Sequence, residues 1–124
     1  METIYTNQAP EAIGPYSQAI VAGEFIFTSG QIPIDPATGR VEAQSIGEQT
    51  EQVMKNLQAV LKAAGSDLGK AVKTTCFLSS MDDFAAFNEI YARYFTGKPA
   101  RSCVAVKTLP KNVKVEVEVI AVLS

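Results

Sequence analysis

A single apolar stripe runs along residues 45–64, and it narrows the folds that this chain can adopt. The apolar side chains there recur at the spacing of one helical face: Ile46, Val53, Met54, Leu57, Val60, Leu61 and Ala64. Ser45 followed by Glu48 has the pattern of a capping box, and Gly65 suits the position after the last turn. We therefore predict a helix over 45–64 that can cover a sheet with one face only.

A second, shorter stripe predicts another helix of the same kind, from Asp82 or Asp83 to Phe95. Its apolar residues are Phe84, Phe87, Ile90, Tyr91 and Tyr94. Ser80 with Asp83 is a plausible cap, and Gly97 with Pro99 ends the helix. This helix also has a single apolar face, so it should pack on the same side of a sheet.

The remaining apolar segments have the pattern of strands. We predict a hairpin with strands through Ile20–Val21 and Phe25–Ser29, a strand at 71–79, and a final hairpin that joins a strand from Arg101 to the strand VKVEVEVIAV at 113–122. In the last strand the valines and Ala121 share one face, whereas Lys114, Glu116 and Glu118 share the other. The expected fold is α+β: one sheet with two helices on one face, in a single domain over 1–124. The uncovered face mixes apolar and charged residues, which suggests that another copy of the chain covers it.

The chain contains no histidine, which removes Ser-His-Asp and Cys-His catalysis and histidine-bound zinc. Cys76 and Cys103 are far apart and match no metal spacing, and they are compatible with a reducing compartment. A net charge of −2 with a pI near 5.1 argues against nucleic acid as a partner. No apolar run approaches the ~20 residues of a membrane span, and the N-terminus lacks the pattern of a signal peptide, so we expect a cytoplasmic protein.

The segment PARSCVAVK, residues 99–107, carries the strongest candidate for a binding site. Arg101 is a permanent cation beside apolar residues, and Cys103 and Ala105 leave space on its side of the strand. A hairpin closed around Pro110 would pair Arg101 with Val119 and bring Glu116 and Glu118 close to the cation. The register cannot choose between the two glutamates. The pattern alone favours the simpler interpretation, alternating charges on a solvated strand.

Other candidates are weaker. Cys103 has no histidine to lower its pKa and fits a small buried strand residue better than a nucleophile. Tyr16 could line a pocket, although core packing is the commoner use, and Asn88 could simply be exposed. The backbone of Thr28–Gly30 could bind an anion. The residues alone support at most a site for a small anion.

Taken together, several motifs closely resemble those of the reactive-intermediate deaminase family, also called the Rid or YjgF family. The motifs are AIGPYSQAI, FTSGQIPIDPATG, KTTCFLSSMDDFAAFNEIYARYF, KPARSCVAVKTLPK and VKVEVEVIAV. The resemblance covers nearly the whole chain in order. It implies a chorismate-mutase-like fold, a homotrimer with sites in the clefts between subunits, and no metal or organic cofactor. The implied activity is the hydrolysis of 2-imino acids, such as 2-iminobutanoate and 2-iminopropanoate, to 2-keto acids and ammonia.

The resemblance also implies roles for individual residues. Arg101 would bind the substrate carboxylate and Glu116 would hold and activate the attacking water. The backbone of Cys103 and of Gly30 would contact the ligand. Tyr16, Ser29 and Asn88 would line the cleft. The connection TGKPARS before the arginine strand is short for this family, so the rim of the cleft should differ.

Three other functions stay open at this point. A regulatory protein could use the same arginine cleft to bind a keto or amino acid without turnover. A ribonuclease or translation inhibitor, an activity attributed to some relatives, is disfavoured by the acidic pI and the missing histidine. A structural role in a larger complex is the third.

Overall fold

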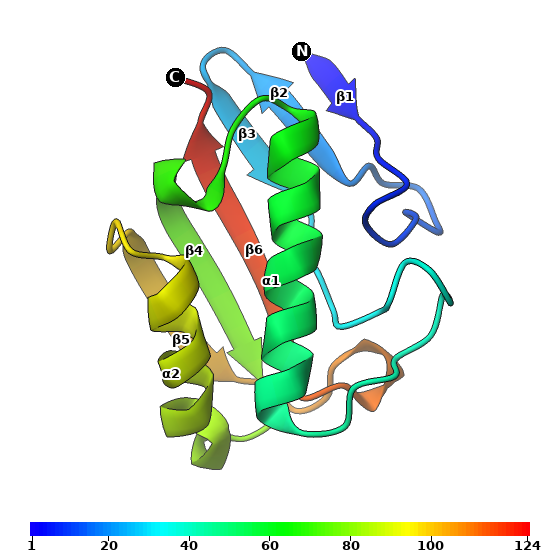
Figure 1. Cartoon of the computed structure of the whole chain (residues 1–124), viewed down its shortest axis with the longest axis vertical. Coiled ribbons are helices and arrows are strands. Elements are labelled where there is room, and N and C mark those ends of the chain that lie inside the picture. The colour runs from blue at the N-terminus through cyan, green and yellow to red at the C-terminus, as the bar shows by residue number, and fades with distance from the viewer.

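The fold is one six-stranded mixed sheet with two α-helices packed on the same face (Figure 1). A computed structural model describes all residues, 1–124. The strand order is β1-β2-β3-β6-β4-β5. The strands are β1 (Glu2–Ile4), β2 (Ala19–Ala22), β3 (Phe25–Thr28), β4 (Ala71–Leu78), β5 (Ala100–Ala105) and β6 (Val115–Val122). The helices are α1 (Ile46–Ala63) and α2 (Phe84–Tyr94), and short 3-10 turns cover Leu68–Lys70, Met81–Asp83 and Pro110–Asn112. The predicted α+β architecture is confirmed.

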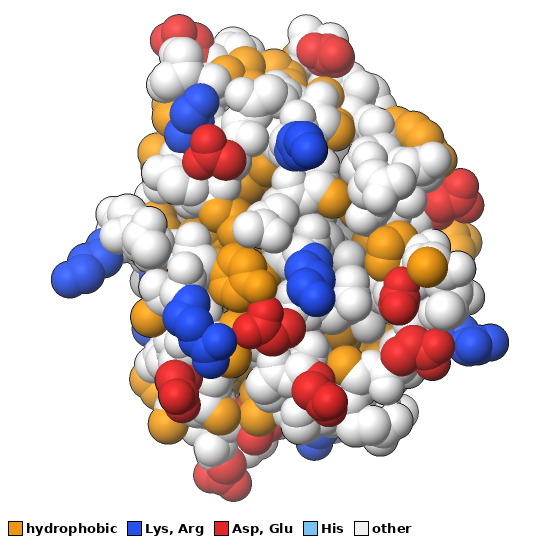
Figure 2. Space-filling model, in the orientation of Figure 1, with side chains coloured by type: hydrophobic (Ala, Val, Ile, Leu, Met, Phe, Trp, Pro, Cys, Tyr) orange, Lys and Arg blue, Asp and Glu red, His pale blue; other side chains and the backbone are white.

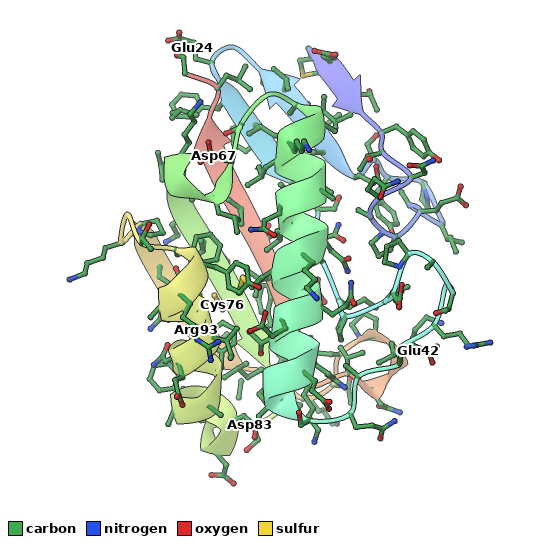
Figure 3. All side chains as sticks on the ribbon, viewed as in Figure 1. Glu24, Glu42, Asp67, Cys76, Asp83 and Arg93 are labelled. Carbon is green, nitrogen blue, oxygen red and sulfur yellow. The ribbon has the colours of Figure 1, made fainter.

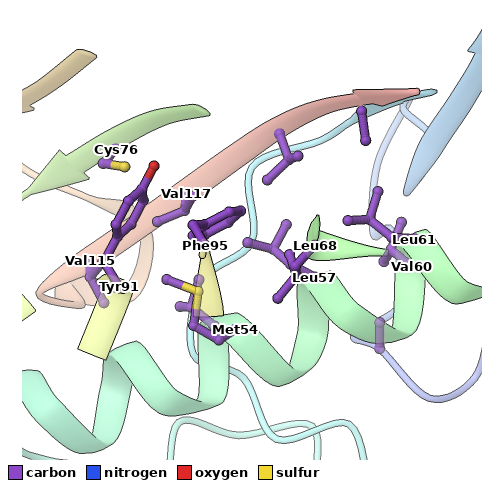
Figure 4. Close-up of a cluster of buried hydrophobic side chains, with 14 of the residues drawn as sticks. Met54, Leu57, Val60, Leu61, Leu68, Cys76, Tyr91, Phe95, Val115 and Val117 are labelled. Atoms are coloured by element: carbon purple, nitrogen blue, oxygen red, sulfur yellow. The ribbon is translucent and has the colours of Figure 1, made fainter. Parts of the chain in front are cut away.

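Helix α1 begins and ends where its sequence pattern predicts. The Ser45 hydroxyl accepts a bond from the Glu48 N–H at 3.1 Å, and the Glu48 carboxylate accepts one from the Ser45 N–H at 3.2 Å, which completes the capping box. Gly65 follows the helix with a φ of +83°, a conformation that favours glycine. The apolar stripe of α1 packs on the buried valines of β6, and α2 adds aromatic side chains to the same core (Figure 4).

Helix α2 starts at Phe84, one or two residues later than the pattern predicts, after the 3-10 turn at Met81–Asp83. The Ser80 hydroxyl caps this turn by accepting from the N–H of Asp82, at 3.1 Å, rather than from Asp83. The Tyr94 hydroxyl donates to the Glu51 carboxylate of α1. Arg93, which is labelled on α2 in Figure 3, forms an ion pair with the same carboxylate. These contacts fix the two helices side by side over the sheet.

The predicted hairpin of the last two strands is wrong. β4 lies between β5 and β6, parallel to β5 and antiparallel to β6, so Arg101 and Val119 both pair with Thr74 instead of with each other. The segment between β5 and β6 crosses the end of β4. There the Val106 N–H donates to the Leu78 carbonyl and the Ser79 N–H donates to the Lys114 carbonyl. Arg101 and Val119 therefore lie in the same row across the sheet, as predicted, but Thr74 of β4 lies between them.

At the N-terminus the β2–β3 hairpin is confirmed, with Gly23 at φ +62° in its turn. The sequence did not indicate β1, a three-residue edge strand that pairs with β2 and buries only Ile4. A strand this short has too few residues for an alternating pattern to stand out.

The two faces of the sheet differ. The helices cover one face, and their outer surface carries mixed charges (Figure 2). The other face, which we call the open face, is apolar over much of its area, and its Phe25, Phe27 and Val104 side chains are 43%, 43% and 47% exposed. The predicted alternation in β6 is confirmed, because Val115, Val117, Val119 and Ala121 are buried beneath the helices. Neither helix is long and apolar enough to cross a bilayer.

Candidate active site

Arg101 is held on the helix-covered side of β5 without an acidic partner. Its Nη1 donates to Oδ1 of Asn88 at 2.6 Å, and its central carbon lies 4.8 Å from the ring centre of Tyr91 and 5.4 Å from that of Phe84. The ion pairs of the structure are Arg40–Glu42 and Arg93–Glu51. Arg101 is therefore a partly buried cation whose charge no carboxylate of the same chain offsets.

The backbone next to Arg101 offers further hydrogen-bond donors. β5 is an edge strand, and the Val106 N–H points toward β4, where it donates to Leu78. Because backbone groups alternate along a strand, the N–H groups of Arg101 and Cys103 point away from β4, toward the free edge. An anion bound by the guanidinium can also accept from this edge.

The thiols in this region do not have the properties of nucleophiles. Burial raises the pKa of Cys76 to about 12, and burial also raises the pKa of Cys103, although Arg101 opposes that effect. Cys76 is completely buried on the helix-covered face (Figure 3). Cys103 is only partly buried, because it lies on the edge strand. A thiol with a raised pKa stays protonated and unreactive at neutral pH.

Glu116 projects from β6 onto the open face and is partly buried there. Burial raises the pKa of its carboxyl group, and the negative charge of Glu118 raises it further. A Cβ atom added at Gly30 would lie 2.0 Å from Oε2 of Glu116. The carboxylate thus occupies the space that the missing side chain of Gly30 leaves, which explains a glycine at this position.

A cleft of about 360 Å³ opens beside this carboxylate. Glu116, Gly30, Ser29 and Tyr16 line it together with the apolar residues Ala12, Ile32, Ile34 and Pro110. Tyr16 is 55% exposed, so the interpretation of Tyr16 as a core residue is wrong. The Ser29 hydroxyl donates to the Ser17 carbonyl, which ties the end of β3 to the N-terminal loop.

Three buried carboxamides hold the loops around this cleft, and none of them is among the residues predicted from the sequence. Gln18 bonds to Thr6 and Pro10 of the N-terminal loop. Asn56, completely buried on α1, donates to the carbonyls of Ile32 and Ile34 at 3.1 and 3.0 Å. Gln49 joins Ala43 to Lys114, two residues before Glu116. A polar residue such as Asn56 next to the apolar stripe of a helix is the signal that could have revealed this role.

The candidate residues form two separate groups. We call Asn88, Arg101 and Cys103 the Arg101 group, and Tyr16, Ser29, Gly30 and Glu116 the Glu116 group. Arg101 pairs with Thr74 and Glu116 with Phe77, so they lie two strands and three residues apart, or about 14 Å between Cα atoms. They also point to opposite faces, so the expectation that Glu116 or Glu118 neutralises Arg101 within the chain is wrong.

Comparison with known proteins agrees with the motifs of the sequence. The family model described as Endoribonuclease L-PSP matches residues 6–123. The RutC family protein y4sK of Sinorhizobium fredii is 54% identical, over 100% of this chain and 99% of that protein. The 2-iminobutanoate/2-iminopropanoate deaminase of Salmonella typhimurium is 49% identical, over 98% of this chain and 97% of that protein.

Among solved structures, E. coli TdcF with bound serine superposes with a TM-score of 0.94 at 44% identity and covers 100% of both chains. Similarity at this level extends over the sheet, both helices and the loops around the cleft. The chain therefore belongs to the endoribonuclease L-PSP family, which is the Rid or YjgF family that its motifs resemble.

Proposed function

We propose that this protein hydrolyses reactive 2-imino acids, such as 2-iminobutanoate and 2-iminopropanoate, to 2-keto acids and ammonia. The observation that carries the proposal is the Arg101 guanidinium, which is partly buried and has no counter-ion in its own chain. A small carboxylate would supply the missing charge. The 49% identity to a named 2-iminobutanoate/2-iminopropanoate deaminase supports the choice of substrate.

Arg101 binds the substrate carboxylate. A guanidinium presents two parallel N–H groups that match the two oxygens of a carboxylate, and one Nη1 bond to Asn88 leaves most of its donors free. The free backbone N–H of Cys103 provides a further donor at the same strand edge. Because aromatic faces and an amide oxygen hold the cation, it keeps its full charge for the ligand.

Glu116 activates the water. Burial and the charge of Glu118 raise the pKa of its carboxyl group, which makes the carboxylate a stronger base than that of an ordinary glutamate. Water attacks the iminium carbon as Glu116 takes its proton. The proton then passes to the nitrogen of the carbinolamine. As the C–N bond breaks, the hydroxyl group gives its proton to Glu116 and becomes the carbonyl of the 2-keto acid, and the departing ammonia takes that proton and leaves as ammonium. A positioned base adds about 10²–10⁴-fold to such a step, and no redox change is involved.

The complete site requires more than one copy of the chain. A 2-imino acid is only a few atoms long and cannot reach Arg101 and Glu116 across about 14 Å and two faces of a sheet. We therefore place the site between subunits of a homotrimer, where the Arg101 group of one copy faces the Glu116 group of the next. The exposed apolar side chains of the open face support such an assembly.

A coupled assay tests the proposal. A threonine dehydratase generates the imine in the presence of semicarbazide, and semicarbazone formation is followed with and without this protein. We expect the wild type to suppress the semicarbazone, Arg101→Ala to lose this effect as an intact oligomer, and Arg40→Ala, an exposed matched control, to retain it.

The alternatives give different outcomes in the same experiment. If the wild type has no effect with any of several amino acids but binds 2-oxobutanoate through Arg101, the site is a sensor and the proposed turnover is wrong. If Arg101→Ala suppresses the semicarbazone as well as wild type, the carboxylate clamp is wrong.

A further inference from the structure

The orientation of the Arg101 guanidinium is set by neutral groups alone. Asn88 accepts one N–H bond, and the rings of Tyr91 and Phe84 lie at 4.8 and 5.4 Å from the central carbon. A cation over an aromatic face is attracted to that face, while its N–H groups stay free at the edge of its plane. The ring that lies closer, Tyr91, therefore has the larger influence on where those N–H groups point.

The Tyr91 ring is itself held by a bond at its hydroxyl and by two neighbouring aromatic rings. Its hydroxyl lies 2.7 Å from the hydroxyl of Thr74, and both side chains are buried. Phe87 and Phe95 pack against the ring, with centroids at 5.6 and 4.5 Å. Figure 4 shows the ring reaching from α2 toward β4 beside Cys76.

Thr74 connects this ring to the arginine strand. It is the residue of β4 that pairs with Arg101, and it points to the same face of the sheet. The Thr74–Tyr91 bond thus links the strand neighbour of Arg101 to the ring that lies beneath its guanidinium. A buried hydroxyl pair is costly to break, because each partner then lacks a hydrogen bond.

We propose that Tyr91, held by Thr74, is a positioning residue that aims the Arg101 fork at the carboxylate of the ligand. The inference rests on the proposed function in taking a 2-imino acid as substrate. The aromatic face holds the cation without neutralising it, whereas a carboxylate in the same place would compete with the ligand. The bond to Thr74 keeps that face beneath the guanidinium.

The test compares KM with kcat for Tyr91→Leu, and the dissociation constant of 2-oxobutanoate by calorimetry. We expect Tyr91→Leu to raise both KM and this constant by about 5- to 30-fold, the range of a desolvated cation–π contact, with kcat nearly unchanged. A merely structural role would reduce the amount of active protein and hence the apparent kcat, without changing KM. Tyr94→Leu, on the same helix but without contact to Arg101, is the matched control.

The hydroxyl bond is tested separately by milder variants that keep the core filled. Tyr91→Phe and Thr74→Val should each raise KM by about 2- to 5-fold. The double variant should have a KM no higher than that of either single variant, because both substitutions remove the same bond. Thr74→Ser keeps the hydroxyl and should have the wild-type KM. If Tyr91→Leu does not form a folded oligomer, these variants carry the test.

The outcomes separate the two proposals. If the wild type turns over imines but all Tyr91 and Thr74 variants share its KM and its affinity for 2-oxobutanoate, the positioning role is wrong and the proposed function stands. If the wild type binds 2-oxobutanoate without turnover, the proposed function fails, and the binding constants alone decide the positioning role. If the wild type neither binds nor turns over, both proposals are overturned.

Discussion

Arg101 and Glu116 point to opposite faces of the same sheet, with β4 between their strands. Within one chain, Arg101 does not contact the Glu116 group, and Glu116 does not contact the Arg101 group. If both serve one reaction, each site must combine the arginine of one subunit with the glutamate of another. This arrangement gives a direct prediction for mixed oligomers.

Arg101→Ala and Glu116→Ala should each be inactive, and a refolded 1:1 mixture of the two should regain activity. In a random trimer, about a quarter of the sites combine an intact arginine with an intact glutamate from the neighbouring subunit. We therefore expect about 25% of wild-type turnover in the semicarbazide assay. Sedimentation confirms that the mixture is oligomeric.

A mixture as inactive as its parents would contradict a site shared between subunits. The control is a mixture of Arg101→Ala with the double variant Arg101→Ala/Glu116→Ala. It contains no intact arginine and should remain inactive.

Glu118→Gln should shift the acidic limb of the activity profile to lower pH. The negative charge of Glu118 helps to raise the pKa of Glu116, so its removal favours the ionised base and lowers that pKa. Burial, the larger cause, remains, so the limb should still lie above that of an ordinary glutamate. The measurement is kcat/KM against pH, with Glu89→Gln as an exposed control on α2. An unchanged limb would mean that another group controls it.

The sequence predicts both helices and the alternation of β6 correctly because these depend on local periodicity. The apolar residues of α1 recur at helical spacing, and Ser45 with Glu48 marks its start. The order of the strands depends on which segments meet in space, and nothing in residues 101–122 shows that Thr74 lies between Arg101 and Val119. Consecutive strands usually pair, which is why the sequence favours a hairpin of the last two strands.

In the candidate site, too, the sequence shows the features that depend on local pattern and not those that depend on contacts between distant segments. The charge of Arg101 stands out in the sequence because its strand otherwise holds small apolar residues. Its distance from Glu116, and the opposite faces to which the two side chains point, depend on β4, which lies between their strands. No sequence pattern predicts the roles of Gln18 and Asn56, because their partners are backbone carbonyls of loops distant in the sequence. Such contacts are set by tertiary structure.

Gly30→Ala should impair turnover more than it impairs folding. The added methyl group would meet the Glu116 carboxylate at 2.0 Å, and the end of a flexible side chain can move aside at little cost to stability. If Glu116 activates the water as proposed, the moved carboxylate no longer holds that water correctly, and a displacement of about 1 Å can cost on the order of 10²-fold in rate. We expect kcat to fall by about 10- to 100-fold with a nearly unchanged melting temperature.

Gly47→Ala is the matched control for this substitution. Gly47 lies in the first turn of α1, and a Cβ atom there has no neighbour within 4 Å. The substitution should leave kcat unchanged and stabilise the fold by up to about 1 kcal/mol through helix propensity. Equal kcat values for Gly30→Ala and Gly47→Ala would show that the position of the Glu116 carboxylate does not limit the rate.

Asn56→Ala should destabilise the protein although it removes only a small polar group. The substitution leaves the Ile32 and Ile34 carbonyls without their donor and opens a cavity on the buried side of α1. An unsatisfied buried group costs about 1–3 kcal/mol, so we expect a loss of roughly 2–4 kcal/mol in the free energy of unfolding, measured by urea at fixed protein concentration. Gln58→Ala, exposed on the same helix, should change it by less than about 0.5 kcal/mol. Equal stability of the two variants would mean that water replaces the amide at no cost, and that the loop beside Glu116 does not depend on Asn56 for its position.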